Sequence, residues 1–167
     1  MHPNAELIAR FYRAFGARDA EAMLACYAPD VRFSDAVFVG LEPHEARAMW
    51  RMLVGRAKDL RVEASAIEAD DARGRAHWDA WYTFSTGRRV HNRIDADFTF
   101  RDGLIVEHRD SFDLWRWSRQ ALGPAGLLLG WSSFLTGKIR ANARAGLAAY
   151  LRENPGEPAP RSAGEPR

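Results

Sequence analysis

Cysteine, long hydrophobic runs and an excess of charge of one sign are all scarce in this sequence. The single cysteine, Cys26, excludes an internal disulfide framework and suits a reducing compartment. No apolar run reaches the length of a membrane-spanning helix. The net charge is only +2 and no basic run carries interleaved aromatic residues, so we expect no nucleic-acid partner.

The amino-terminal residues also lack a secretory signal, because Met1-His-Pro-Asn4 leads directly into a charged amphipathic segment. Together with the single cysteine, this predicts a cytoplasmic protein. The chain is rich in apolar and aromatic residues, which make up 47% and 11% of its 167 positions. That content is enough to bury one sizeable core.

Three consecutive segments, 76–85, 88–100 and 104–112, read as β-strands. Thr86-Gly87 and Arg101-Asp-Gly103 separate them, and glycine accepts the positive φ that tight hairpin turns need. The stretch is therefore expected to form an antiparallel meander.

Side chains two positions apart on a strand share a face. His77, Asp79 and Trp81 therefore lie together on the first strand, and His108 and Asp110 lie together on the third. If both faces are concave and covered, two imidazoles and two carboxylates converge on one cavity. The alternative for His77 and Asp79 is an ion pair on an exposed or dimer-facing surface of the sheet.

Helical segments dominate the chain before the meander. Asn4 can cap a first helix that ends near Gly16, and Asp19 can cap a short second one. A strand over 30–38, a helix that begins at Pro43 and a strand over 60–69 follow. Helices followed by antiparallel strands indicate an α+β protein with the helices packed on one face of a curved sheet.

After the meander, 115–122 is expected to form a short helix, and the apolar segment 125–137 is interrupted by glycines. Apolar residues then recur at helical spacing up to Leu151. This terminal helix could cover a pocket, dock on a partner subunit or lie at a membrane surface. Because apolar stripes most often meet other protein, the first two roles are favoured over membrane association.

Several segments carry a family pattern: Leu7-Ile-Ala-Arg-Phe-Tyr12, Tyr27-Ala-Pro-Asp-Val-Arg-Phe-Ser-Asp35, and Phe98-Thr-Phe-Arg-Asp-Gly-Leu-Ile105 leading into His108-Arg-Asp-Ser-Phe-Asp-Leu114. Over roughly residues 6–117 the chain resembles the nuclear transport factor 2-like superfamily, also called SnoaL-like or ketosteroid-isomerase-like. The resemblance implies a cone-shaped, curved antiparallel sheet with the amino-terminal helices on its concave face. It also implies a homodimer with one apolar pocket per subunit for a small hydrophobic ligand, without a cofactor.

With this resemblance, the chain divides into a cone domain over 1–122, a carboxy-terminal helical extension over 123–153 and a tail over 154–167. The tail is rich in proline, glycine and charge, so we expect it to be disordered.

The segment His108-Arg-Asp-Ser-Phe-Asp-Leu114 is similar to the last strand of limonene epoxide hydrolase, in which the first aspartate is the general base. The resemblance places Asp110 at that base. The Arg-x-Asp pair of that enzyme falls on His77 and Asp79, and its Tyr-x-Asn pair, which helps to hold the water, falls on Phe33 and Asp35.

Ketosteroid isomerase offers a second comparison, in which Asp35 looks like the base. Phe11 stands where that enzyme has a tyrosine donor on its first helix, and Tyr12 is one residue away on a different face. A steroid isomerase of that design is therefore not expected. SnoaL-like polyketide cyclases, which combine one aspartate with nearby polar groups, fit the residue types more loosely.

The leading hypothesis is a cofactor-independent acid–base enzyme of isomerase, cyclase or epoxide hydrolase type. The catalytic candidates are Asp110, Asp35, Asp79, His77 and His108, and the substrate-binding candidates are Phe33, Phe11, Trp50 and Trp81. Carboxyl groups enclosed by aromatic rings lose hydration and repel one another, which raises the pKa of at least one. The alternative is a non-catalytic ligand-binding or dimerisation module. No metal is expected, because His-x-Asp on a strand is a weak metal spacing.

Overall fold

The computed structural model describes residues 1–155, and most of the tail that was expected to be disordered, residues 156–167, lies outside the described residues. In chain order the elements are α1 (Pro3–Gly16), α2 (Ala20–Leu24), β1 (Tyr27–Ser34), α3 (Pro43–Arg56), β2 (Arg61–Ala69), β3 (Arg73–Thr83), β4 (Arg89–Arg101), β5 (Leu104–Ser111), α4 (Leu114–Leu122), α5 (Pro124–Leu129) and α6 (Ser133–Glu153).

The strands form one sheet in the order β1-β5-β4-β3-β2. Strands β2 to β5 pair antiparallel with their sequence neighbours, which confirms the predicted meander. Strand β1 differs from the expectation of an all-antiparallel sheet, because it pairs parallel with β5. The long connection between the two strands, which includes α3 and the rest of the meander, allows this parallel pairing.

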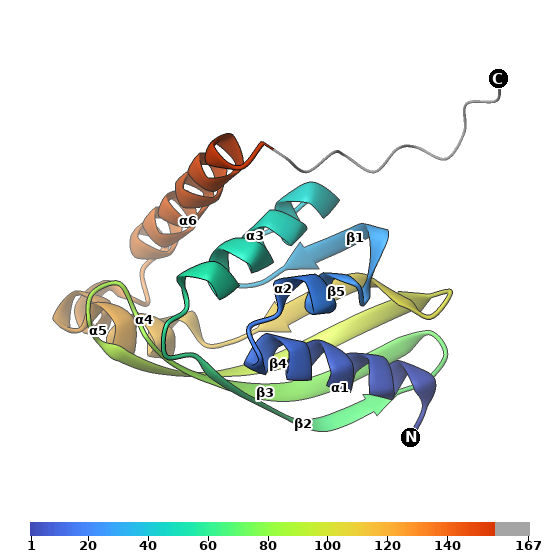
Figure 1. The fold of residues 1–167 in the computed structure, drawn as a ribbon. Helices are drawn as coiled ribbons and strands as arrows, with labels where there is room; N and C mark the ends of the chain where they lie inside the picture. The colour runs from blue at the N-terminus through green and yellow to red at the C-terminus, as the bar shows by residue number, and fades with distance from the viewer. Residues whose placement is uncertain (156–167) are drawn as a thin grey trace.

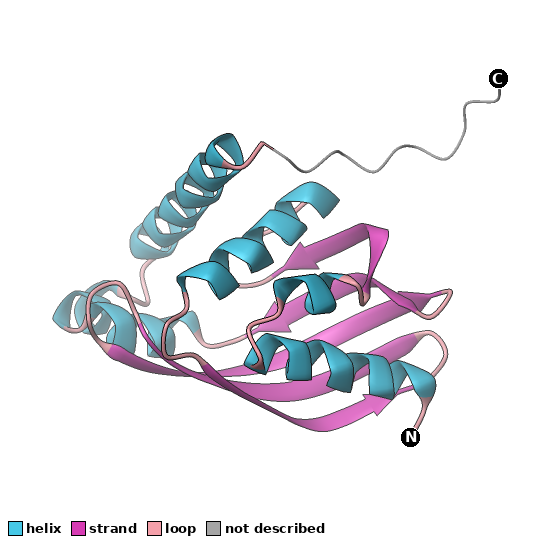
Figure 2. Ribbon diagram, in the orientation of Figure 1, coloured by secondary structure: helices cyan, strands magenta, loops and turns pink. Residues whose placement is uncertain are grey.

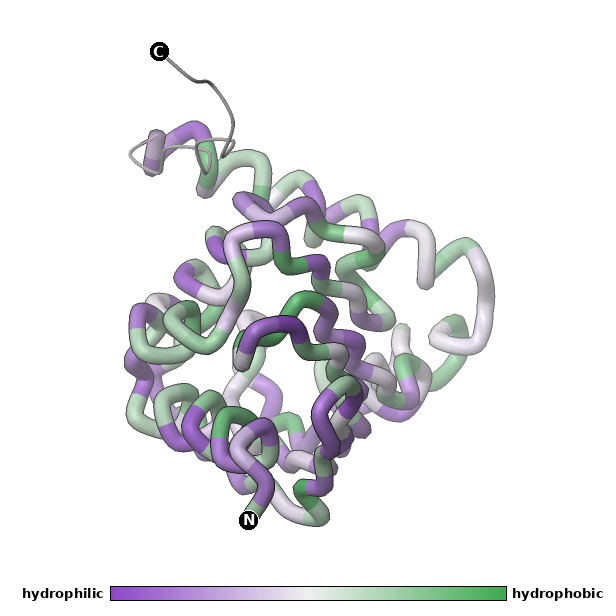
Figure 3. The backbone as a smooth tube through the Cα atoms, turned by 90° about the vertical axis from the view of Figure 1, so that its right-hand side faces the viewer, coloured by the Kyte–Doolittle hydropathy of each residue, from purple (hydrophilic) through white to green (hydrophobic). Residues whose placement is uncertain are grey.

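All three early helices, α1, α2 and α3, cover one face of the curved sheet, and no helix covers the opposite face in the described part of the chain (Figures 1 and 2). The buried side chains of the middle strands point toward these helices, among them Ala76, Trp78, Ile94 and Phe98. Along the tube in Figure 3, hydrophilic and hydrophobic residues alternate over short distances, as expected for elements with one buried side. The α+β cone expected from the sequence is therefore the fold of this chain.

The expected capping residue is correct for α2 and incorrect for α1. Asp19 caps α2 as predicted. Asn4 does not cap α1, because His2 takes that position and its ring accepts a hydrogen bond from the Asn4 backbone. The Asn4 side chain instead donates to the carbonyl oxygens of Asp70 and Asp71, at 2.8 and 3.2 Å. It thereby ties the start of α1 to the turn between β2 and β3.

The carboxy-terminal helices pack on the cone of their own chain. Trp117 of α4 is buried in a small second core and donates its indole N–H to Tyr82 Oη at 2.7 Å. Helix α6 runs alongside α3 (Figure 1), where it buries Leu147. None of the helices in residues 1–155 is both long and apolar enough to cross a membrane.

Helix α6 also holds the loop between β1 and α3. The Arg140 guanidinium donates to the carbonyl oxygen of Ala36 at 2.9 Å, and that of Arg144 donates to the carbonyl oxygen of Val39 at 2.8 Å. The loop is therefore fixed from outside the cone by two charge-assisted hydrogen bonds.

Candidate acid–base site

Strand β5 places two polar side chains in the core. His108 and Asp110 are only 1% and 4% exposed, and they lie two residues apart on the inward face of the strand. Phe98 and Ala96 of β4 pair with them, and the small Ala96 stands opposite the carboxylate. Buried groups of this kind persist only when they have hydrogen-bond partners.

These partners form a chain of hydrogen bonds through the core. Trp50 Nε1 donates to Tyr27 Oη at 2.8 Å, and Tyr27 Oη lies 2.7 Å from His108 Nδ1. His108 Nε2 lies 3.0 Å from Asp110 Oδ1, which also accepts from Trp78 Nε1 at 3.3 Å. An indole N–H only donates, so Tyr27 Oη accepts from Trp50, and an ionised carboxylate only accepts, so His108 Nε2 donates to Asp110. With its proton on Nε2, His108 offers Nδ1 as the acceptor for the hydroxyl proton of Tyr27.

Aromatic rings enclose His108. The ring centroids of Phe98, Phe33, Phe11 and Trp50 lie 4.4, 5.1, 5.4 and 6.0 Å from that of the imidazole. Three of the predicted substrate-binding residues, Phe11, Phe33 and Trp50, therefore pack in the core around His108, and their role in substrate binding stays a prediction. In such a water-poor environment the electrostatic interaction between the imidazole and Asp110 is stronger than at the surface.

Asp35 stands in the loop that follows β1. Its Oδ1 accepts hydrogen bonds from the backbone N–H groups of Val37 and Phe38, at 2.7 and 2.6 Å. Burial raises the pKa of Asp35 to about 6, and the nearby charge of Asp110 contributes in the same direction, although the two backbone N–H groups partly oppose the shift. Asp35 therefore exchanges its proton far closer to neutral pH than an ordinary aspartate does.

Asp35 and Asp110 share the wall of one cavity. It has a volume of about 290 Å³ and is lined by Ser34, Asp35, Ala36, Arg109, Asp110, Ser111 and Phe112. In each carboxylate, two N–H groups hold Oδ1, whereas Oδ2 has no hydrogen-bond partner within residues 1–155. In both carboxyl groups the protein therefore holds Oδ1, and Oδ2 is available to a ligand in the cavity.

His77, Asp79 and Trp81 do not join this cavity, so the expected convergence of the two His-x-Asp pairs is wrong. They lie on the outer face of the sheet, where His77 Nδ1 is 2.7 Å from Asp95 Oδ1 and Asp79 Oδ1 is 2.6 Å from His91 Nε2. Trp81 stacks on His91 with a centroid distance of 4.6 Å. The physical reason is that the other set of alternating β3 residues is the apolar one and faces the helices: Ala76, Trp78 and Ala80.

Three buried residues of the site were not among the sequence candidates: Tyr27, Trp78 and Tyr12. Tyr27 and Trp78 belong to the hydrogen-bond chain. Tyr12 Oη is buried without a hydrogen-bond partner in the described residues. Burial, and then the charge of Asp110, raise the pKa of Tyr12 well above its ordinary value, which keeps its hydroxyl protonated. Tyr12 lies four residues after Ile8 and three before Phe15, and this helical spacing was the signal that could have placed it in the core.

Metal binding finds no support within residues 1–155, which contain no group of three or more His, Cys, Asp or Glu side chains placed to hold an ion. The chemistry that the two carboxyl groups of the cavity offer is proton transfer. A carboxyl group with a raised pKa beside a second, hydrogen-bonded carboxylate can give and take protons on a bound molecule.

Comparison with known proteins agrees with this fold. A family model described as the SnoaL-like domain matches residues 8–108. A solved candidate SnoaL-like polyketide cyclase from Jannaschia sp. CCS1 is similar, with 17% identity, a TM-score of 0.64, and coverage of 73% of this chain and 93% of that one. No curated protein matches this chain in sequence.

Two further solved structures have similar scores. An LEH-like epoxide hydrolase from M. tuberculosis shares 21% identity, with a TM-score of 0.62 and coverage of 77% of this chain and 96% of that one. An NTF2-like protein of unknown function from Burkholderia pseudomallei shares 23% identity, with a TM-score of 0.60 and coverage of 68% and 92%. At these identities the likeness shows the fold, and the fold alone does not select a reaction.

Proposed function

Because this chain belongs to the family of SnoaL-like domains, we propose that it is an acid–base enzyme that moves a proton on a small hydrophobic substrate, of isomerase or cyclase type. The observation that carries the proposal is the pair of carboxyl groups, Asp35 and Asp110, on the wall of one cavity. Their surroundings differ, and pairs of titratable groups in different surroundings are a common basis for separate acid and base roles.

Asp110 is the base in this proposal. His108 and Trp78 hold its Oδ1, so Oδ2 accepts a proton from the carbon next to a substrate carbonyl. Asp35 is the acid, because its pKa of about 6 leaves a useful fraction protonated near neutral pH. It gives this proton to the carbonyl oxygen, so that the substrate becomes an enol while Asp110 becomes protonated. In an isomerisation, Asp110 gives its proton to another carbon while the enol O–H proton returns to Asp35. In a cyclisation, the enol carbon attacks a second carbonyl of the same substrate, whose oxygen takes the proton of Asp110 while the enol O–H proton returns to Asp35.

Epoxide hydrolysis is the second candidate, and the similarity to the LEH-like epoxide hydrolase favours it. The same pair would serve, with Asp110 activating a water and Asp35 protonating the epoxide oxygen. The resemblance placed His77 and Asp79 at the Arg-x-Asp pair, but on the outer face His77 binds Asp95 and Asp79 binds His91, so they support this reaction less.

A ligand screen tests the proposal. We expect enolisable polyketide-like ketones to raise the melting temperature of the full chain, because binding to the folded state alone stabilises it. Steroids, terpenoids and epoxides serve as the competing classes, and turnover of each hit is then followed directly. Stabilisation by epoxides, with formation of a diol, would replace cyclase chemistry by hydrolysis.

Asp110→Asn is expected to lower turnover of the hit about a hundredfold, because the amide accepts the hydrogen bonds of Trp78 and His108 but cannot take a proton. Asp95→Asn is the matched control, since the Asp95 side chain is 81% exposed on the outer face. Equal activity of the two variants would contradict the role of Asp110. Ligand binding without turnover in the unchanged protein would leave the alternative, a non-catalytic ligand-binding module.

Tyr12→Phe is expected to stabilise the folded protein by about 1 kcal/mol, because it removes a buried hydroxyl that has no partner in the described residues. If that hydroxyl donates to a substrate oxygen, turnover falls about tenfold in the same variant. Tyr82→Phe is the control and should lower the stability, since it removes the acceptor of the Trp117 N–H. Urea unfolding and steady-state kinetics measure both effects, and a less stable Tyr12→Phe would refute the assignment.

The homodimer and the cytoplasmic location stay predictions. We expect the two subunits to meet at the outer face of the sheet, which no helix covers in the described residues. On this face Trp81 stacks on His91, and the Arg61 guanidinium lies over the Trp81 ring. Sedimentation equilibrium of the full chain measures that state.

A further inference from the structure

The carboxy-terminal extension has an unusual charge distribution. Residues 114–152 contain no acidic residue, and the central part of this stretch, 121–137, contains no charged residue at all. Six cationic residues flank that uncharged part: Arg116, Arg119, Lys138, Arg140, Arg144 and Arg152. The extension therefore combines an apolar centre with positive flanks, although the net charge of the chain is small.

Helix α5 packs with its glycines inward. Gly126 is its only buried residue, and a Cβ added there would lie 1.9 Å from the Ser118 carbonyl oxygen of α4. A Cβ added at Gly130 would lie 2.2 Å from Ser118 Oγ. Only glycine fits at these contacts, so the leucines of α5 are turned away from α4. This is the reverse of a helix that packs on a protein core, which buries its leucines.

The result is an exposed apolar tip, formed by Leu127, Leu128, Leu129, Trp131 and Phe134. Leu128 is 68% exposed, Trp131 75% and Phe134 74%. Helix α5 lies at one end of the molecule, beyond the sheet (Figure 1). Large exposed apolar patches mark places where a protein meets a partner or a membrane.

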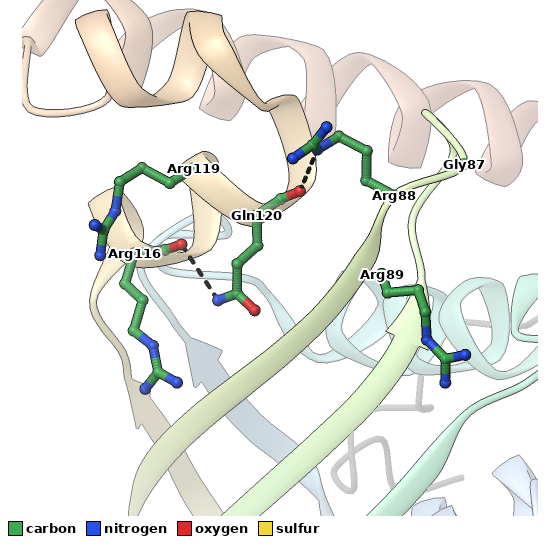
Figure 4. A pocket seen from close by; sticks show the side chains of 6 residues that line it. All are labelled: Gly87, Arg88, Arg89, Arg116, Arg119 and Gln120. Carbon is green, nitrogen blue, oxygen red and sulfur yellow. Dashed lines mark hydrogen bonds between the residues drawn. The ribbon is translucent and has the colours of Figure 1, made fainter.

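An arginine cleft lies beside the tip. It has a volume of about 640 Å³ and is lined by Gly87, Arg88, Arg89, Arg116, Arg119 and Gln120, without an acidic residue (Figure 4). None of its four guanidinium groups forms an ion pair within residues 1–155. Arg119 Nε is buried there without a hydrogen-bond partner. A Cβ added at Gly123, the residue before α5, would lie 3.0 Å from Arg88 Cζ, so the cleft adjoins the helix that carries the tip.

We propose that the apolar tip and the arginine cleft together dock this protein on a bilayer that contains anionic lipids. The leucines, Trp131 and Phe134 enter the interfacial region of the bilayer, and the arginines of the cleft bind lipid phosphate groups. Arginine matches phosphate geometry through paired N–H groups, and tryptophan is favoured at membrane interfaces. This inference goes beyond the proposed function and does not depend on it.

Two other occupants fit the surface less well. A second copy that met the tip symmetrically would place one arginine cleft against the other, because a two-fold interface pairs the same patch of both subunits. Residues 114–152 offer no carboxylate to compensate that repulsion. Helix α6 was the segment expected to act as a lid or dock, and it already packs on α3 of its own chain and leaves the tip uncovered.

Co-sedimentation of the full chain with vesicles tests the proposal. We expect binding to phosphatidylcholine vesicles that contain phosphatidylglycerol and little binding to phosphatidylcholine alone. Added salt should weaken binding, since the arginines act through charge. Leu128→Ser combined with Trp131→Ser should lower the partition coefficient about tenfold or more, and Arg89→Gln combined with Arg116→Gln should lower it by a similar factor.

Matched controls separate these effects from a general loss of stability. Leu53→Ser changes an exposed leucine of α3, and Arg10→Gln with Arg13→Gln removes two exposed charges of α1. Both controls should bind vesicles as the unchanged protein does. A protein that stays in the supernatant with both kinds of vesicle would overturn the proposal, and so would tip variants that bind normally. A dimer that the tip variants convert to a monomer, without vesicle binding, would assign the tip to a second copy instead.

Discussion

Asp35→Asn is expected to raise the free energy of unfolding at pH 8 by about 2–3 kcal/mol and to lower turnover about a thousandfold. The gain in stability arises because the pKa of Asp35 is raised by burial from 3.8 to about 6, so its charged form is disfavoured in the folded state. Asparagine keeps an oxygen for the backbone N–H groups of Val37 and Phe38 and carries no charge. The loss of turnover arises because the amide cannot donate the proton that the substrate oxygen needs.

The sign of the pH dependence follows from the same shift. A group whose pKa is higher in the folded state stabilises the fold fully below its unfolded pKa, near 3.8, and loses that contribution as the pH rises through about 6. The stability difference between Asp35→Asn and the unchanged protein should therefore be large at pH 8 and shrink toward pH 4. Urea unfolding at the two pH values measures it.

Asp30→Asn provides the contrast for this experiment. Its hydrogen bond to the Arg101 guanidinium lowers the pKa of the exposed Asp30, so its charged form is the favoured one. Removal of that charge should give no gain in stability at pH 8. An Asp35→Asn protein that is less stable than the unchanged one at both pH values would show that Asp35 is a structural turn residue rather than a strained acid. The turnover of the unchanged enzyme should fall above pH 6, as protonated Asp35 is lost.

His108→Ala is expected to lower the free energy of unfolding by about 3–5 kcal/mol. The substitution leaves a cavity among four aromatic rings, and it removes the partners of Tyr27 Oη and Asp110 Oδ1. Both oxygens then stay buried without those hydrogen bonds. Chemical denaturation measures the loss.

His77→Ala is the matched control, because it is the same substitution on the other face of the same sheet. His77 contacts Asp95 and Asp79 at a surface where water and salt screen the interaction, so the loss should be about 0–1 kcal/mol. If His108→Ala does not fold, Tyr27→Phe tests the same hydrogen-bond chain, since it removes only the hydroxyl between Trp50 and His108. It should lower the free energy of unfolding by about 2 kcal/mol. Equal losses for the two histidines would contradict the buried hydrogen-bond chain.

Local sequence patterns predicted the strands well, because alternation and turn residues are encoded within a few positions. They also placed His108 and Asp110 on one face, since two residues on the same strand need no knowledge of the rest of the sheet. The pattern could not decide by itself whether His77 and Asp79 share that face. The available signal was the apolar character of Ala76, Trp78 and Ala80, which alternate with His77 and Asp79. Because burial of unpaired charge is costly, the apolar set is the one expected to face the core.

Long-range contacts were beyond the sequence pattern. Tyr27 reaches His108 because β1 pairs parallel with β5, and this pairing joins segments about eighty residues apart. A raised pKa was expected for at least one carboxyl group, and only the structure identifies Asp35 as such a group. Likewise, the inward glycines of α5 became interpretable only after α4 was seen to lie against them.

Two hydrogen bonds from arginines of α6 connect the carboxy-terminal extension to the loop that carries Asp35. Arg140 and Arg144 fix the carbonyl groups of Ala36 and Val39, which lie one and four residues after Asp35. Both arginines lie outside the family match, which ends at residue 108. Loss of these two hydrogen bonds would let the loop relax, so that the pKa of Asp35 would fall toward that of a solvated carboxyl group. A helix outside the family match thus helps to set the proton affinity of the proposed acid through a loop, and not through the strand that carries the proposed base.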